Sequence, residues 1–168
     1  TALESIELPD SIKTTYDKYG NIESYGIGTY IFYGCSSLNR VKLPKDLEVI
    51  KDSMFEGCTS LKTIELPVGI TKIEQEAFKD CSSLSKIKLS GKVTEIGNNA
   101  FKDCTQLVSA YIPGSVQKIG ENAFTGCSLL TIYGTENSYA QTYATENGIQ
   151  FSTGEMPDSE FTEEAAGE

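Results

Sequence analysis

Five cysteines recur along the chain at one fixed interval, and this interval limits the possible folds more than any other feature. Each lies 23 residues after the previous one: Cys35, Cys58, Cys81, Cys104 and Cys127. Internal repeats of about 20 to 50 residues are typical of solenoids, in which each repeat forms one turn and contacts only its neighbours. The interval therefore predicts a solenoid rather than a globular packing of helices and strands.

Apolar residues keep the same interval as the cysteines. A phenylalanine stands three residues before each cysteine and a leucine three residues after it. One repeat is too small to bury these side chains, whereas stacked repeats bury them together. The predicted core comprises Phe32, Cys35, Leu38, Phe55, Cys58, Leu61, Phe78, Cys81, Leu84, Phe101, Cys104, Leu107, Phe124, Cys127 and Leu130.

The spacing within one repeat predicts its local structure. The motif L-x-x-I-x-L ends in the alternation of a half-buried strand, and Pro44, Pro67 and Pro113 stop it. The motif V-x-x-I that follows predicts a second short extended segment. Ala-Phe followed by Cys at helical spacing predicts one or two helical turns over residues 74–80, 98–103 and 121–126.

The repeat resembles the BspA-like leucine-rich repeats of bacterial surface proteins. The resemblance covers Leu3 to about Phe151 and is carried by strings such as CTSLKTIELP, CSSLSKIKLS and CTQLVSAYIP, followed by IEQEAF, IGNNAF and IGENAF. It implies a curved solenoid with a parallel sheet on its concave side, placed outside the cell or on its surface and used for adhesion or carbohydrate-associated contacts. The family is not known as a catalytic fold. We therefore expect an α/β solenoid of about five 23-residue turns, with a parallel sheet on one face and short helical turns on the other.

The repeats occupy residues 1–134, and the first copy is longer than the others. Leu3, Ile6 and Leu8 match later columns with a step of 35, which places a 12-residue insertion at about residues 14–25. Such an insertion projects a loop from the solenoid. It contains Tyr16, Tyr19 and Tyr25. The loop is either an aromatic contact loop or a hairpin around Tyr19-Gly20-Asn21 whose tyrosines pack on the neighbouring turn.

The two ends of the chain differ from the repeats. Residues 135–151 predict a carboxyl-terminal cap, because Ser138 and Gln141 have the spacing of a capping box and Tyr139, Ala140, Tyr143 and Ala144 share one helical face. Residues 152–168 form an acidic tail or linker with no basic residue. Thr1-Ala2-Leu3 aligns with the residues that follow a repeat cysteine, so we expect at least one more repeat upstream.

Composition excludes several classes of function. The 168 residues contain no His, which excludes imidazole acid–base chemistry and His-ligated zinc. The net charge of −10 argues against nucleic acid as a partner. The apolar stretches are too short to form a transmembrane segment. We expect no enzyme, no cofactor and no metal; a carboxylate calcium site is a weaker alternative, because no dedicated ligand spacing is present.

The cysteine column predicts free thiols. Equivalent residues on stacked turns have parallel Cα–Cβ vectors, which suits disulfide geometry poorly. One ligand per turn also cannot surround a tetrahedral metal ion. Buried thiols packed as small apolar groups are therefore favoured, and five thiols should be titrated in denaturant.

Charged residues on the exposed columns alternate in sign from turn to turn. Glu7, Lys42, Glu65 and Lys88 form one such column, which Tyr111 continues, and Lys72, Glu95 and Lys118 form another. The alternation favours a structural ladder that avoids like-charge contacts, or else a mixed-charge face for a partner. The candidate contact residues are Arg40, Lys42, Thr63, Glu65, Lys86, Lys88 and Tyr111, together with Tyr16, Tyr19 and Tyr25 of the insertion.

The sequence thus predicts a non-catalytic extracellular or cell-surface module that binds or adheres to a protein or a glycan. The alternative is a structural spacer that presents a neighbouring domain. A carboxylate enzyme is the weakest hypothesis, because most acidic residues alternate with lysines rather than converge. We expect the chain to be a monomer.

Overall fold

The computed structural model describes residues 2–12, 15–16, 22–24 and 27–157. Its strands are very short, because each turn of the chain contributes only two to four residues to a sheet. They are β1 (Ser5–Glu7), β2 (Thr15–Tyr16), β3 (Ile22–Ser24), β4 (Arg40–Lys42), β5 (Val49–Ile50), β6 (Lys72–Ile73), β7 (Lys86–Lys88), β8 (Glu95–Ile96), β9 (Ser109–Ile112), β10 (Lys118–Ile119), β11 (Thr131–Gly134) and β12 (Gln150–Ser152). One helix, α1 (Tyr139–Glu146), follows β11.

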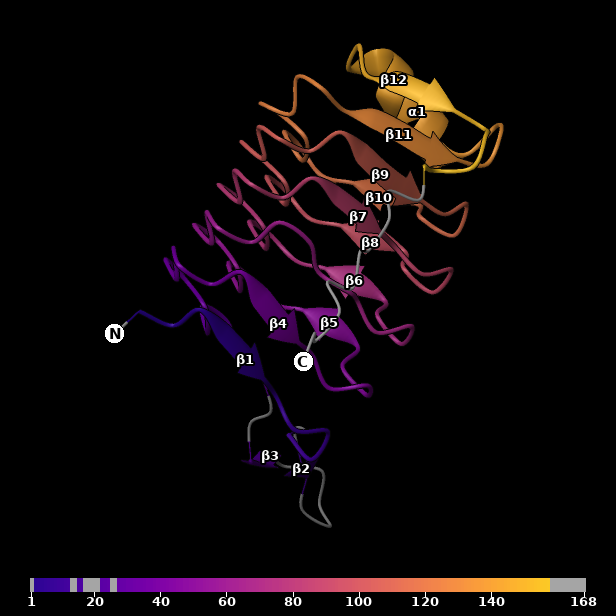
Figure 1. Cartoon of the computed structure of the whole chain (residues 1–168). Helices are drawn as coiled ribbons and strands as arrows, with labels where there is room; N and C mark the ends of the chain where they lie inside the picture. The colour runs from indigo at the N-terminus through magenta and orange to yellow at the C-terminus, as the bar shows by residue number, and fades with distance from the viewer. Residues whose placement is uncertain (1, 13–14, 17–21, 25–26, 158–168) are drawn as a thin grey trace, which may run out of the picture.

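The turns stack into a solenoid with two parallel sheets, seen as two columns of arrows in Figure 1. Sheet 1 contains β1–β4 and β7–β9–β11–β12. The L-x-x-I-x-L motif builds β1, β4, β7 and β9, and the last two strands extend the sheet towards the carboxyl end. Sheet 2 is built by the V-x-x-I motif and contains β5–β6–β8–β10. Lys86 lies opposite Ser109 and Ile73 opposite Ile96, which is the 23-residue register of the sequence. A parallel-sheet solenoid of about five turns is therefore confirmed.

Sheet 1 is interrupted at its third turn. Residues 63–65 occupy the position of a strand between β4 and β7 but have no strand geometry. This turn is tied to the next by Ser85, whose amide and hydroxyl both donate to the Lys62 carbonyl at 3.0 and 3.2 Å. The strand expected from CTSLKTIELP does not form, while sheet 2 runs past the same turn without a break.

The helical turns expected over residues 74–80, 98–103 and 121–126 are wrong; these segments are consecutive tight turns. Left-handed backbone at Glu76 and Asp80 (φ 54° and 58°) interrupts any helix. Alternate amides also point out of the turn, so that Phe78 N–H donates to Ala100 O at 2.8 Å on the next turn. A helix would use these amides within itself, whereas here they join neighbouring repeats.

The core is a row of stacked rings and thiols along the solenoid axis. Phe32, Phe55, Phe78, Phe101 and Phe124 stack with centroids 5.1–5.3 Å apart. All five cysteines are free thiols, and each from the second onward donates to the carbonyl of a phenylalanine one turn earlier at 3.1–3.2 Å. Fifteen core positions were expected from the repeat. All of them are buried except Cys35, the first cysteine of the column, which is half-buried.

Helix α1 covers the last turn of the solenoid. Ser138 Oγ accepts from Gln141 N at 3.3 Å, and the Gln141 side chain returns to the Asn137 amide at 2.7 Å, so the S-x-x-Q spacing does start the helix. Tyr143 packs edge-on against Phe124 with centroids 6.1 Å apart. Tyr139, which the pattern placed on the buried face, is 45% exposed.

The long first repeat contains an antiparallel pair. β1 lies opposite β4 with Ser5 beside Arg40, which is the step of 35 read from the sequence. β2 and β3 pair antiparallel, in agreement with the hairpin alternative for the insertion. The expected turn at Tyr19-Gly20-Asn21 lies outside the described residues, as does Tyr25.

Candidate binding face

The outward side of sheet 1 brings most of the predicted contact residues together. Each strand alternates an outward polar residue with an inward apolar one, as in Arg40, Val41 and Lys42, where only Val41 is buried. The register places Lys88 beside Tyr111. We call this surface the contact face; it comprises Arg40, Lys42, Thr63, Glu65, Lys86, Lys88, Tyr111 and Tyr133.

Tyr133 belongs to the contact face although sequence reasoning missed it. It lies opposite Tyr111 in the β9–β11 pair, so the step here is 22 residues rather than 23. A strict count of 23 places Gly134 in that position instead. The sequence does contain a pattern that identifies Tyr133. Thr131, Ile132 and Tyr133 repeat the polar–apolar–tyrosine order of Ser109, Ala110 and Tyr111, with which they pair.

The tyrosines of the insertion are not part of the described face. Tyr16 lies in β2, whose side chains are not described, and Tyr19 and Tyr25 lie outside the described residues. Their proposed role as contact residues therefore stays a prediction from the sequence.

The contact face holds cations that lack a carboxylate partner. Lys42 is paired with Glu7, and its pKa is raised mainly by the hydrogen bond to that carboxylate. Within the described part of the chain, Arg40 and Lys88 have no acidic side chain within ion-pair distance. The expected Lys42–Glu65–Lys88 ladder does not form, since Glu65 lies on the turn where sheet 1 is interrupted.

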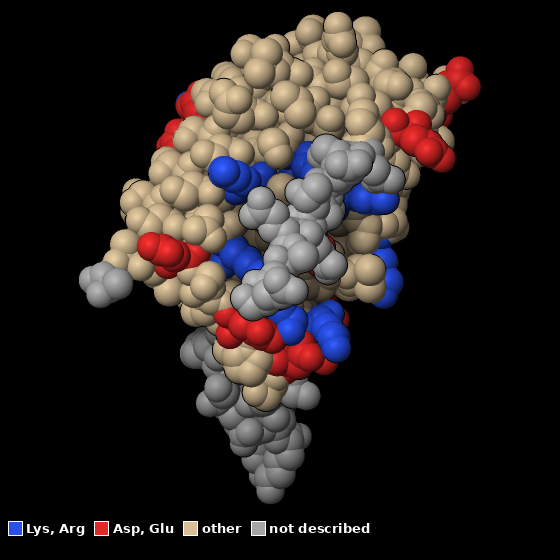
Figure 2. Space-filling view, in the orientation of Figure 1, with Lys and Arg blue, Asp and Glu red and all other residues tan. Residues whose placement is uncertain are grey.

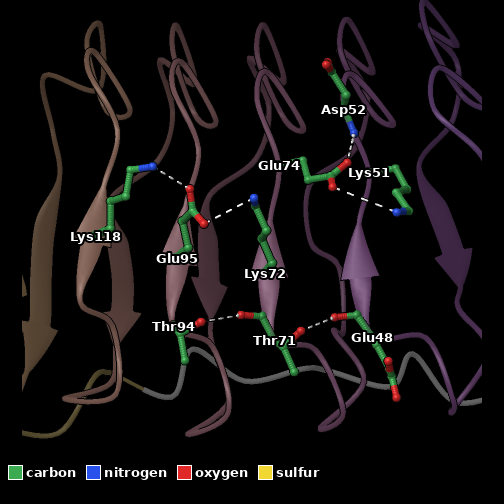
Figure 3. Close-up of polar contacts among 9 residues, drawn as sticks. All are labelled: Glu48, Lys51, Asp52, Thr71, Lys72, Glu74, Thr94, Glu95 and Lys118. Carbon is green, nitrogen blue, oxygen red and sulfur yellow. Dashed lines mark hydrogen bonds and ion pairs between the residues drawn. The ribbon is translucent and has the colours of Figure 1, made fainter.

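Sheet 2 neutralises its own charges. Figure 3 shows Glu95 between two lysines, with Lys72 Nζ at 3.2 Å and Lys118 Nζ at 2.8 Å. The hydrogen bond from Lys118, and then that from Lys72, lowers the pKa of Glu95. Glu74 joins Lys51 at 3.9 Å and also accepts from the Asp52 amide at 3.1 Å. Here the alternation of signs is a structural ladder between turns.

Hydroxyl groups continue this ladder along the edge of sheet 2. Thr71 Oγ1 donates to the Glu48 carbonyl at 3.1 Å, and Thr94 Oγ1 donates to the Thr71 carbonyl at 3.3 Å (Figure 3). These hydroxyls are used to connect turns. The strand cations without an ion pair in the described residues, Arg40 and Lys88, therefore lie on sheet 1 rather than on sheet 2.

The distribution of charge over the molecule separates this surface from the rest. Figure 2 shows Lys and Arg side chains gathered over the strands of the two sheets, with Asp and Glu grouped mainly around the margin. The whole chain carries 24 acidic and 14 basic residues. A cationic area on an acidic protein thus marks the side that an acidic partner would approach.

A shallow cleft borders Tyr111 at the carboxyl end of the contact face. Its volume is about 390 Å³, and its lining consists of Tyr111, Gly134, Thr135, Glu136, Thr153, Gly154 and Glu155. At Gly134 the two turns approach closely, since a Cβ there would lie 2.7 Å from the Ile112 carbonyl oxygen. Tyr111 is half-buried, so part of its side chain remains accessible.

Reactive and metal-binding groups are not concentrated anywhere in the described residues. No three His, Cys, Asp or Glu side chains there are close enough to share a metal ion. Burial raises the pKa of the Cys58 thiol to about 12 and raises that of Cys81 further, so these sulfurs are protonated at neutral pH. In the same described ranges, no helix has the length and apolar character needed to cross a membrane.

Comparison with known proteins identifies the repeat. The family model for the BspA type leucine rich repeat region matches residues 25–149 with six copies. No curated protein shows a significant match.

Three crystal structures of bacterial proteins are similar. A leucine rich repeat protein from T. pallidum has 35% identity and a TM-score of 0.65 over 77% of this chain and 57% of that one. A leucine-rich repeat protein from Bacteroides ovatus has 26% identity and a TM-score of 0.53 over 78% of this chain and 37% of that one. A leucine rich cell surface protein from Faecalibacterium prausnitzii has 26% identity and a TM-score of 0.46 over 90% of this chain and 30% of that one. The chain thus spans little more than half the length of the first of these proteins and less of the others.

Proposed function

Because the chain belongs to the BspA-type leucine-rich repeat family, we propose that it is a non-catalytic binding module of the cell surface or the extracellular space that recognises a protein partner. The family is one of interaction modules, which supports the general role. The contact face is the surface that we assign to the partner.

The observation that carries this proposal is the combination of Arg40 and Lys88, without acidic partners in the described residues, with Tyr111 and Tyr133 on the same side of sheet 1. Tyrosine and arginine are enriched at protein interfaces, where they supply contact area and hydrogen bonds at a moderate entropic cost. On sheet 2 every lysine of the strands is already paired. Arg40 and Lys88, beside two tyrosines, therefore serve recognition better than stability.

The partner should present carboxylates to the cations and an apolar group to the tyrosines. Uncompensated charge steers association and selects an acidic surface, while the rings provide buried area. Because stacked turns fix the backbone beneath these side chains, little ordering is needed on binding, which favours affinity. A glycan would instead use the Tyr111 ring and the hydroxyl and carboxylate groups of the adjoining cleft.

Binding of the purified chain to immobilised extracellular matrix proteins and to a glycan panel tests the proposal. Lys88→Glu should weaken protein binding by about 5- to 30-fold, as expected for loss of about 1–2 kcal/mol at an interface residue. Lys92→Glu is the matched control, since it makes the same charge change at an exposed loop position. Tyr133→Ala should also weaken binding while the urea midpoint stays near that of the parent.

Two results would contradict the proposal. Equal affinities of Lys88→Glu and Lys92→Glu would show that the contact face is not used. Absence of any saturable partner would favour the other hypothesis, a spacer that presents a neighbouring domain. Saturable binding to glycans alone, lost in Tyr111→Ala, would keep the binding role but replace the protein partner.

A further inference from the structure

The residues that follow β12 turn back towards the contact face. β12 is the outermost strand of sheet 1, and its Ser152 lies opposite Tyr133, which in turn lies opposite Tyr111. Residues 153–155 then line the cleft beside Tyr111, which is two strands away from β12. The chain is therefore directed over the outward side of sheet 1 shortly before residues 158–168, which we call the distal tail.

The distal tail carries the charge opposite to that of the sheets. Five of its eleven residues are acidic and none is basic. The strands of sheets 1 and 2 contain six basic residues and two acidic ones, although acidic residues outnumber basic ones in the chain as a whole. Figure 2 shows cations gathered over these strands. The distal tail is therefore complementary in charge to the surface over which the chain is directed.

The distal tail is long enough to reach the cations of the contact face. Lys88 lies beside Tyr111 on the neighbouring strand, and Arg40 lies two turns before the turn of Lys88. Neighbouring strands are about 4.8 Å apart, so about 14 Å separate the strand of Tyr111 from that of Arg40. Eleven extended residues span up to about 36 Å. Both cations, which lack an acidic partner among the described residues, are therefore within reach.

We propose that the distal tail docks on the contact face of its own chain, with its carboxylates against Arg40 and Lys88. Each ion pair is weak at an exposed site. The tether, however, keeps the tail at an effective concentration of the order of millimolar, so that a weak contact is enough to populate the docked state. The docked tail covers the cations assigned above to an acidic partner, so tail and partner compete. This competition, unlike the docking itself, rests on the proposed function.

Carbodiimide cross-linking of the full chain tests the docking without any partner. The reagent joins a carboxylate to an amine only where the two are in contact, and mass spectrometry of the digest identifies the joined residues. Lys88 should be joined to carboxylates of the distal tail in the monomer band of a denaturing gel. The Lys42–Glu7 ion pair is the internal positive control. Lys102, which lies on a Phe-containing turn, should not be joined to the tail.

A pair of charge variants tests the docking independently. Glu163→Gln combined with Glu164→Gln removes two carboxylates of the distal tail and should shift the backbone amide resonance of Lys88 in the ¹⁵N-labelled chain. Glu121→Gln combined with Glu146→Gln is the matched control, because it makes the same charge change at two exposed positions outside the tail. The control should leave the Lys88 resonance unchanged. Circular dichroism and urea midpoints verify that both double variants fold.

The same two double variants test the competition, with a synthetic hexaglutamate peptide as the acidic probe. The tail variant should bind the peptide about 2- to 10-fold more tightly than the control variant does. This gain is expected for a face that the tail covers between half and nine-tenths of the time, because apparent affinity falls with the fraction of open sites. Absence of any gain would refute the competition between tail and partner.

Cross-linking of Lys42 to Glu7 without any link from Lys88 to the distal tail would overturn the docking. So would a Lys88 resonance at the same position in the tail variant and in the control. Links to the tail that occur only in the dimer band would mean that the tail of one copy occupies the face of another, which also overturns docking within one chain. These results require no protein partner, so failure of the docking is distinguishable from failure of the proposed function.

Discussion

Replacing Gly97 by Ala tests how closely adjacent turns approach one another. A Cβ at Gly97 would lie 2.6 Å from Gln75 N and 2.7 Å from the Glu74 carbonyl carbon, both backbone atoms of the preceding turn. Gly97 has no left-handed φ, so the strain would come from contact alone. The two turns would have to separate by several tenths of an ångström, although the Gly97 N–Ile73 O bond of 2.8 Å holds them together.

The expected cost follows from these contacts. Overpacking of a well-packed interior costs about 1–3 kcal/mol, and weakening the hydrogen bond between the turns adds about 1 kcal/mol. Gly97→Ala should therefore lower the free energy of unfolding by about 2–4 kcal/mol. For a chain of this length that corresponds to a fall in Tm of about 5–15 °C.

Gly91→Ala is the matched control, since a Cβ at Gly91 would meet nothing within 4 Å. It should be neutral or stabilise the chain by about 0.4–1 kcal/mol, because Ala restricts the unfolded state more than Gly does. Urea unfolding followed by circular dichroism measures both variants. If the two agreed within about 0.5 kcal/mol, the close approach of the turns at Gly97 would be refuted.

Three other predictions concern the core and the charges. Phe78→Ala should destabilise the chain by about 3–5 kcal/mol in urea unfolding, because the ring stacks at 5.2 Å on both neighbours; a loss below 1 kcal/mol would contradict the stack. Ellman's reagent should label Cys35 first in the native protein and all five thiols in guanidinium, since burial raises the pKa of Cys58 to about 12; rapid native labelling of all five would be inconsistent with this. The lowered pKa of Glu95 means that its contribution to stability is present above its unfolded pKa and is lost as pH falls through its folded pKa. Lys118→Ala should raise the Glu95 pKa in an NMR titration and flatten that acid-side loss, whereas an unchanged pKa would rule out the ion pair.

The register of the solenoid could be predicted because equivalent residues pair directly. Ser5 lies opposite Arg40 and Lys86 opposite Ser109, as the columns require. Each apolar column must stay buried on every turn, so a shift by one residue would expose it. The fixed spacing therefore determines which residues are neighbours, even where it does not determine the local backbone.

The backbone of the Phe-containing turns could not be predicted from spacing alone. Ala and Phe before Cys fit a helix as well as a tight turn. Asn99 and Asn122 were the informative residues, because Asn adopts left-handed backbone readily and both have φ near 55°. Asn stands before two of the three Ala-Phe pairs, with Glu76 before the other, and this position indicates a turn in which amides are shared with the next repeat.

The contact face was predicted in part. Lys88 and Tyr111 come together because they share a column, whereas Tyr133 does so only through a step of 22 residues that counting by 23 misses. The interruption of sheet 1 near Glu65 has no counterpart in the sequence pattern, since Thr63, Ile64 and Glu65 fit the strand motif. The structure was therefore needed to identify the cations of the contact face that have no acidic partner among the described residues.

The hydrogen bonds between successive Phe-containing turns all run in one direction. The amides of each turn donate to carbonyls of the following turn, as from Phe78 N to Ala100 O and from Phe101 N to Ala123 O, both at 2.8 Å. One side of such a turn therefore presents donors and the other side presents acceptors. The stack of turns is consequently polar, because a turn inserted in the reverse orientation would place donors against donors.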